Sequence, residues 1–417
     1  MRDEDNIWNN DNEENEDDEL TQEAVERFET MLEQQRPAYF DTEEFELIID
    51  YYLEKNDLQH SREAVELAVE QHPDDTELRL RYHLTKGSCF SSDGKHQQAI
   101  DSYCKALHYY GDDDRSEVYR AIGYEYACLG LSDKAIDFYN KAIDERPDDT
   151  EAWSALGDTY RQLDRLEDAI EMYEYVLAID PTHLWANMHL ANSYYDLDRF
   201  QEAIDSLHEA IDHGVDTSMI HASLGDCHYR KGEFIDAKNE YNQALKRNEY
   251  LTEAWSGLGY VYSDTGNSAK AIRFFEKAYR LEPFNDDHLY NLAAEYHKIN
   301  ENEKALQYLL EIEQQQPNDP DLYFFLGDLL AEMNRVDEAI LYLKIGLERT
   351  DNEATLLYLL AYLYLERGDK QTSLGYLEEA LKAYPEYYKD FIEYNPELIT
   401  NDVDVMELIN VIARSGA

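Results

Sequence analysis

The chain has few cysteines, few basic residues and no long apolar run. Its four cysteines, Cys89, Cys104, Cys128 and Cys227, form no CxxC pair. So few scattered cysteines argue against a disulfide framework or a zinc ribbon. No stretch approaches the roughly 20 apolar residues of a membrane span, and the segment after Met1 does not resemble a signal peptide. We therefore expect a cytoplasmic protein that does not bind membranes.

Acidic residues strongly outnumber basic ones. The 417 residues include 91 Asp and Glu against 37 Lys and Arg, a net charge of −54. Such a polyanion repels the phosphates of nucleic acids and anionic lipids, so neither is an expected partner. Residues 1–19 combine low hydrophobicity with charge of almost one sign, which predicts a disordered acidic tail.

A repeat of 34 residues organises residues 116–387. A small residue recurs at this period, each time directly after a Leu or Ile: Gly123, Gly157, Ala191, Gly225, Gly259, Ala293, Gly327 and Ala361. A second small column follows twelve residues later: Ala135, Ala169, Ala203, Ala237, Ala271, Ala305, Ala339 and Ser373. Small residues on two helices let their backbones approach closely, so each unit is expected to be a helix pair. One pair cannot bury both of its faces, so stability should depend on stacking.

These columns resemble the tetratricopeptide repeat (TPR) family. Its signature is complete in one unit, at Trp255, Leu258, Gly259, Tyr262, Ala271, Phe275 and Pro283. The resemblance implies an all-α, right-handed α-solenoid superhelix of about ten repeats. Eight contiguous repeats span residues 116–387, and two divergent repeats are expected over residues 42–115.

The open ends of such an array need amphipathic caps. At the front, residues 20–37 are expected to form a capping helix with the stripe Leu20, Ala24, Phe28, Met31 and Leu32. At the back, capping helices are expected over residues 388–417, the last with the stripe Val405, Leu408, Ile409 and Ile412. The alternative for this last helix is a lid that binds a partner.

The sequence shows no catalytic constellation. It lacks a P-loop lysine motif and a Gly-flanked nucleophilic Ser, so we predict neither enzymatic activity nor a cofactor. Among the histidines of residues 183–228, His208 and His213 are five positions apart and cannot share one helix face. His221 and His228 occupy packing columns. We predict no metal site, although the sequence leaves open whether this histidine-rich region binds a metal.

In the family that the chain resembles, the first helix of each repeat lines a concave groove. Carried over position by position, the resemblance predicts a protein-binding surface of Arg120, Tyr124, Asp158, Arg161, Trp185, Met188, Asn192, Tyr195, Met219, Asp226, Tyr229, Arg230, Tyr260, Tyr290, Asn291, Phe324 and Tyr358. Aromatic and Met side chains supply contact area at low entropic cost, as peptide binding requires. The alternative is that these side chains are partly buried against neighbouring repeats.

The sequence therefore predicts a non-catalytic scaffold or adaptor that binds a peptide or helix of another protein. One alternative is an acidic, chaperone-like binder of basic proteins, for which strong salt sensitivity is expected. The other is an enzyme or metal-binding protein with an unrecognised site. The sequence names neither the partner nor the oligomeric state.

Overall fold

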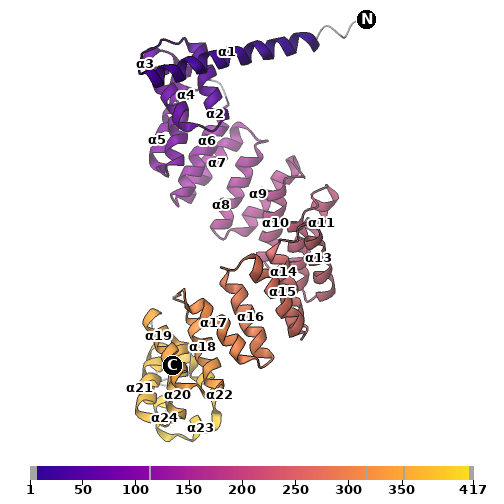
Figure 1. Ribbon diagram of the computed structural model, residues 1–417, viewed down its shortest axis with the longest axis vertical. Helices are drawn as coiled ribbons and strands as arrows, with labels where there is room; N and C mark the ends of the chain where they lie inside the picture. The colour runs from indigo at the N-terminus through magenta and orange to yellow at the C-terminus, as the bar shows by residue number, and fades with distance from the viewer. Residues whose placement is uncertain (1–6, 112–113, 316, 351–352, 413–417) are drawn as a thin grey trace. The chain divides into compact units, whose positions relative to one another are not determined.

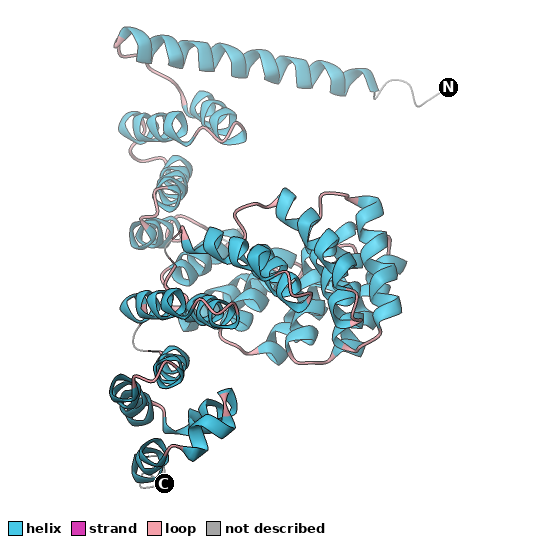
Figure 2. Ribbon diagram, turned by 60° about the horizontal axis from the view of Figure 1, so that its bottom comes forward, coloured by secondary structure: helices cyan, strands magenta, loops and turns pink. Residues whose placement is uncertain are grey.

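The protein folds entirely into helices in the part of the chain that the structure describes. The computed structural model describes residues 7–111, 114–315, 317–350 and 353–412, with side chains from Leu20 onwards. Every regular element in these ranges is a helix, as Figures 1 and 2 show, which confirms the predicted all-α fold. The chain forms two compact units, Met1–Val215 and Asp216–Ala417.

The first unit holds α1 to α11. After α1 (Ile7–Gln34), consecutive helices pack in pairs. The pairs are α2 (Thr42–Glu54) with α3 (Leu58–Gln71), α4 (Thr76–Ser92) with α5 (His96–Ala106), α6 (Ser116–Cys128) with α7 (Ser132–Glu145), α8 (Thr150–Gln162) with α9 (Leu166–Ile179), and α10 (Leu184–Asp196) with α11 (Phe200–Asp212).

The second unit continues the same pairing. Its pairs are α12 (Ser218–Arg230) with α13 (Phe234–Arg247), α14 (Thr252–Asp264) with α15 (Ser268–Leu281), α16 (Asp286–Lys298) with α17 (Asn302–Glu313), α18 (Pro320–Glu332) with α19 (Val336–Arg349), and α20 (Ala354–Glu366) with α21 (Lys370–Ala383). A 3-10 turn (Pro385–Tyr387) then leads into α22 (Tyr388–Tyr394), α23 (Pro396–Asn401) and α24 (Val403–Ile412).

The small residues of the first column are needed because a large side chain of the second helix packs on each of them. This side chain belongs to the residue sixteen positions later in the sequence. A Cβ atom added to Gly259 would lie 2.5 Å from the Phe275 ring, and one added to Gly157 would lie 2.8 Å from the Tyr173 ring. Where the column carries Ala191, the residue sixteen positions later is the smaller Leu207, which is also fully buried. Glycine is therefore found mainly where the second helix contributes a ring.

Every first helix ends in the same left-handed turn. Two residues after the last helical position, the backbone φ is positive at Asn56, Gly94, Gly130, Asp164, Asp198, Gly232, Gly266, Asn300, Asn334 and Gly368. In each of these turns, the next residue donates its N–H to the carbonyl five positions back, as Arg165 does to Tyr160 at 2.9 Å. This is the Schellman arrangement, which favours Gly, Asn or Asp at the left-handed position. It redirects the chain into the second helix.

The helix at the front begins earlier than the sequence predicts. The sequence predicts a disordered tail over residues 1–19 and a capping helix from Leu20, whereas α1 already begins at Ile7. Extending an existing helix needs no new nucleus, so a polar segment can continue a docked one. Ala24 and Phe28 are buried against α2, while Leu20 is 56% exposed and does not belong to the buried stripe. Residues 1–6 lie outside the described residues.

The helices at the back cover the last pair. Val405 and Ile409 of α24 are fully buried in a cluster with residues of α20 and α21, and Leu408 and Ile412 pack against this cluster. The stripe predicted for this segment thus faces the array.

Candidate functional site

The predicted binding residues differ widely in exposure. We call the residues of this set the first-helix surface, because all of them lie on α6, α8, α10, α12, α14, α16, α18 or α20. In the first unit, Tyr124 and Trp185 are 56% and 59% exposed. In the second unit, Met219 and Tyr260 are 37% and 38% exposed. These four large side chains are available for contact with a partner.

Two predicted residues are buried instead. Met188 is 7% exposed and Tyr358 is 2% exposed. The Tyr358 ring lies 5.6 Å from the Phe391 ring of α22, and its hydroxyl donates a hydrogen bond to the Tyr384 carbonyl at 2.9 Å. The C-terminal helices therefore cover the first-helix surface at α20, which the repeat pattern could not indicate. Neither Met188 nor Tyr358 is available to a partner.

A cavity of about 420 Å³ adjoins the exposed Tyr124 in the first unit. Arg120 lines it and forms ion pairs with Glu151 and, at 3.5 Å, with Asp149 of the next repeat. Glu125 also lines it; this carboxylate is almost fully buried and accepts a hydrogen bond from His96 Nδ1 at 2.7 Å. The cavity thus combines an aromatic rim with carboxylates.

Asp158 and Trp185 are linked through His189 in the first unit. The Tyr173 hydroxyl donates a hydrogen bond to Asp158 at 2.6 Å, and His189 Nε2 lies 3.9 Å from the same carboxylate. Burial lowers the pKa of His189, so its imidazole is neutral at physiological pH. Trp185 stacks on this imidazole with 6.2 Å between ring centroids. One indole face is supported while most of the side chain stays exposed.

In the second unit, polar contacts join the first helices of three consecutive repeats. The Tyr229 hydroxyl donates to Asp264 at 2.7 Å, and Asn291 Nδ2 donates to the Tyr260 hydroxyl at 2.8 Å. The rings of Tyr229 and Tyr260 lie 6.3 Å apart. These contacts hold α12, α14 and α16 in a row, so part of the predicted surface serves contact between repeats.

Asp226 has an unusual environment for a carboxylate. Burial raises its pKa to about 6, although the Tyr241 hydroxyl, which donates to it at 2.7 Å, opposes the rise. Asp158 and Asp226 both directly follow a glycine of the first small column, and each binds the tyrosine that packs on that glycine. Both acids therefore have a structural role that the sequence analysis missed. The signal was the recurrence of Tyr fifteen positions after each Asp.

The other predicted residues lie in mixed environments. Asn192 and Arg230 are exposed, while Arg161, Tyr195, Tyr290 and Phe324 are partly buried. Tyr195 contacts the Phe200 ring at 5.4 Å, and the Tyr290 hydroxyl donates to Asp319 in the next repeat.

Comparison with known proteins agrees with this architecture. Tetratricopeptide repeat families match residues 172–351 and 326–388, and the family "Anaphase-promoting complex, cyclosome, subunit 3" matches residues 129–210. The chain is a tetratricopeptide repeat protein. No curated protein matches it.

Several solved structures resemble the chain over part of its length. A thermophilic TPR protein from Thermus thermophilus is 24% identical over 43% of this chain and 98% of its own, with a TM-score of 0.36. MamA is 27% identical over 41% of this chain and 93% of its own, with a TM-score of 0.37. YrrB, a TPR protein with an unusual peptide-binding site, is 18% identical over 46% of this chain and 97% of its own, also with a TM-score of 0.37.

The TPR protein has a second acidic cavity, formed by α9, α10 and α11. Its volume is about 460 Å³, and its walls include apolar side chains such as Leu177 and Leu190. Carboxylates also line it, namely Glu174, Glu202, Asp205 and Glu209. The combination suits a side chain with an apolar stem and a cationic end, such as Lys or Arg.

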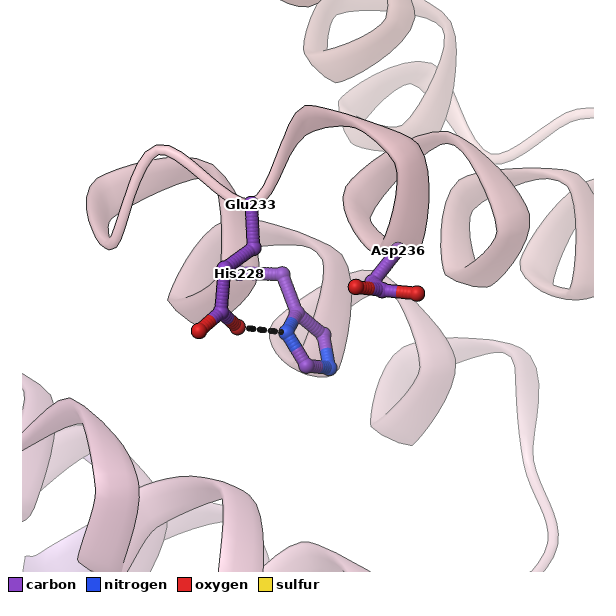
Figure 3. Close-up of side chains that lie close together, drawn as sticks. All are labelled: His228, Glu233 and Asp236. Atoms are coloured by element: carbon purple, nitrogen blue, oxygen red, sulfur yellow. Dashed lines mark hydrogen bonds and ion pairs between the residues drawn. The ribbon is translucent and has the colours of Figure 1, made fainter.

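One histidine of the predicted histidine-rich region lies in a cluster with metal-ligating chemistry. His228, Glu233 and Asp236 each offer a ligand atom within 4.8 Å of the others, and Figure 3 shows the imidazole between the two carboxylates. The sequence analysis missed Glu233 and Asp236, because it considered only the histidines.

None of the helices in the described part of the chain combines the length and the apolarity needed to cross a membrane.

Proposed function

We propose that this TPR protein is a non-catalytic interaction module that binds an extended or helical segment of a partner protein on its first-helix surface. The observation that supports this most is the exposure of Tyr124 and Trp185, each more than half exposed although large. Rigid aromatic side chains of this kind dominate the energy of protein interfaces. The four free cysteines suit the cytoplasmic site of action that the sequence predicts.

We propose further that the bound segment is basic. Carboxylates line both the cavity beside Tyr124 and the cavity of α9, α10 and α11, and the net charge of −54 would attract a cationic segment over a distance. Mg²⁺ or salt should then slow the association of the segment with the protein, because dissolved ions screen this attraction. A purely electrostatic chaperone, the alternative, would lose binding with salt but would tolerate loss of the exposed aromatics.

A peptide-display selection against the full chain tests the proposal. The selected peptide is synthesised, and its Kd is measured for the wild type and for Tyr124→Ala, Trp185→Ala and Tyr260→Ala. At least one of these variants should bind about 30-fold more weakly, as expected for a hot spot worth about 2 kcal/mol. Melting temperatures are measured on the same samples.

Two exposed aromatics outside the first-helix surface provide matched controls. Tyr39 is 67% exposed and Phe284 is 91% exposed, so Tyr39→Ala and Phe284→Ala remove similar area elsewhere. Both should leave the Kd unchanged. Equal affinity for all five variants would exclude the first-helix surface, and salt-sensitive binding under those conditions would favour the electrostatic alternative.

A further inference from the structure

The turn between α12 and α13 differs from the corresponding turn of other repeats. In five repeats a Lys or Arg lies over the Tyr ring near the end of the first helix, with 4.4 to 5.1 Å from the cation to the ring centroid. The pairs are Lys134 over Tyr126, Arg165 over Tyr160, Arg199 over Tyr194, Lys270 over Tyr262 and Lys304 over Tyr296. The cation always comes from the fifth or the eighth position after the ring.

At the α12–α13 turn, both of these positions carry carboxylates. The ring is the imidazole of His228, the fifth position is Glu233 and the eighth is Asp236. Two acids thus occupy the positions from which, in five other repeats, a Lys or Arg covers the ring. The repeat architecture fixes the backbone positions of these residues, since the same turn geometry recurs along the array.

One ligand atom of each of the three side chains lies within 4.8 Å of the other two, and Asp236 is exposed to solvent. His228 is the most buried of the three residues, with 15% of its side chain exposed. Its Nδ1 donates a hydrogen bond to Glu233 Oε2 at 2.7 Å. Lys231 binds the other carboxylate oxygen of Glu233, Oε1, at 2.8 Å. Asp236 lies on the other side of the imidazole in Figure 3.

We propose that His228, Glu233 and Asp236 bind a divalent transition-metal ion of the Zn²⁺ class. One imidazole nitrogen with two carboxylates suits such an ion, whereas Mg²⁺ and Ca²⁺ prefer oxygen ligands alone. Bond lengths of about 2.0 to 2.2 Å place tetrahedral ligand atoms roughly 3.5 Å apart. Glu233 Oε2, which lies 2.7 Å from His228 Nδ1, must therefore move slightly away by side-chain rotation, and the three ligand atoms already lie within 4.8 Å of one another. The neutral imidazole binds the ion through one ring nitrogen and carries its proton on the other.

This site is independent of the proposed peptide binding, and a Co²⁺ titration of the full chain tests it. The titration is carried out at physiological ionic strength with excess Mg²⁺, which occupies the general acidic surface. We expect a visible absorption band that saturates at one equivalent and disappears when Zn²⁺ is added. Asp236→Asn should weaken Co²⁺ binding about tenfold or more.

Two variants separate metal binding from folding. His228→Tyr combined with Glu233→Arg rebuilds the Tyr160, Arg165 and Asp168 arrangement of an earlier repeat, so the variant should keep its circular dichroism spectrum and melting temperature but lose the Co²⁺ band. His208→Ala removes an exposed histidine outside the cluster and should leave the titration unchanged. The absence of a saturable band in the wild type, or a band of wild-type strength in the double variant, would overturn the proposal.

Discussion

Replacing Asp226 by Asn should stabilise the protein at neutral pH. The folded state holds the pKa of Asp226 at about 6, roughly two units above that of an exposed Asp, because burial disfavours its charge. At pH 7.5 this rise corresponds to a penalty of at most about 3 kcal/mol, since each unit is worth about 1.4 kcal/mol. The neutral amide still accepts the Tyr241 hydrogen bond but loses about 1 kcal/mol of charge assistance. A net gain of about 1 to 2 kcal/mol follows.

The sign of the pH dependence provides a sharper test. A carboxyl whose pKa is higher in the folded state favours folding at low pH, and this contribution is lost as the pH rises from about 4 to about 6. The advantage of Asp226→Asn over the wild type should therefore shrink by about 1 kcal/mol or more between pH 7.5 and pH 5.0. The lower value stays above the pI of about 4.3, which limits precipitation.

Urea denaturation followed by circular dichroism measures both quantities. Asp158→Asn is the matched control, because Asp158 accepts the same type of tyrosine hydrogen bond but its side chain is 44% exposed. It should give no comparable gain. A destabilised Asp226→Asn variant at pH 7.5, or an advantage that does not change with pH, would refute the argument that burial controls this carboxyl.

Four further changes test packing, the tail and the surface. Gly259→Leu should cost about 1 to 3 kcal/mol or more, because even a Cβ at this position meets the Phe275 ring at 2.5 Å; an unchanged melting temperature would contradict the packing assignment. Deleting residues 1–19 should leave the melting temperature almost unchanged, since this segment is nearly all polar, and a loss of many degrees would show that it docks. Trp185→Ala should weaken binding of a selected peptide with little effect on stability, whereas Tyr229→Ala should also reduce stability, because it removes the hydrogen bond to Asp264; the reverse pattern for Trp185 would indicate a packing role.

The sequence predicted the core of each repeat better than its surface. The small columns could be found because Gly259 and Ala271 recur at a fixed period and contact residues within their own repeat, and both are buried as expected. The exposure of a surface residue depends instead on which neighbour covers it. Tyr358 is buried because α22 folds back onto α20, a contact made by a segment outside the periodic pattern.

Polar partners were equally hard to predict from single positions. Asp226 follows the expected column, yet its environment depends on a hydroxyl from a different helix. The cluster at His228 depends on substitutions five and eight positions later, so only comparison among the repeats of this chain shows it. In both examples the contact joins residues at two different positions of the repeat. An analysis that follows one position from repeat to repeat does not find such a contact.

The left-handed turn after each first helix has a consequence for how the chain tolerates mutation. Ten positions must hold a conformation that β-branched residues almost never adopt, and all ten carry Gly, Asn or Asp. In a saturation-mutagenesis experiment scored by cellular abundance, these solvent-facing positions should stand out as sensitive at intervals of mostly 34 residues. Gly should be the best-tolerated replacement at Asp164 and Asp198, and Val or Ile the worst. Sensitivity to substitution at these regular intervals would thus reflect the left-handed backbone conformation rather than burial or binding.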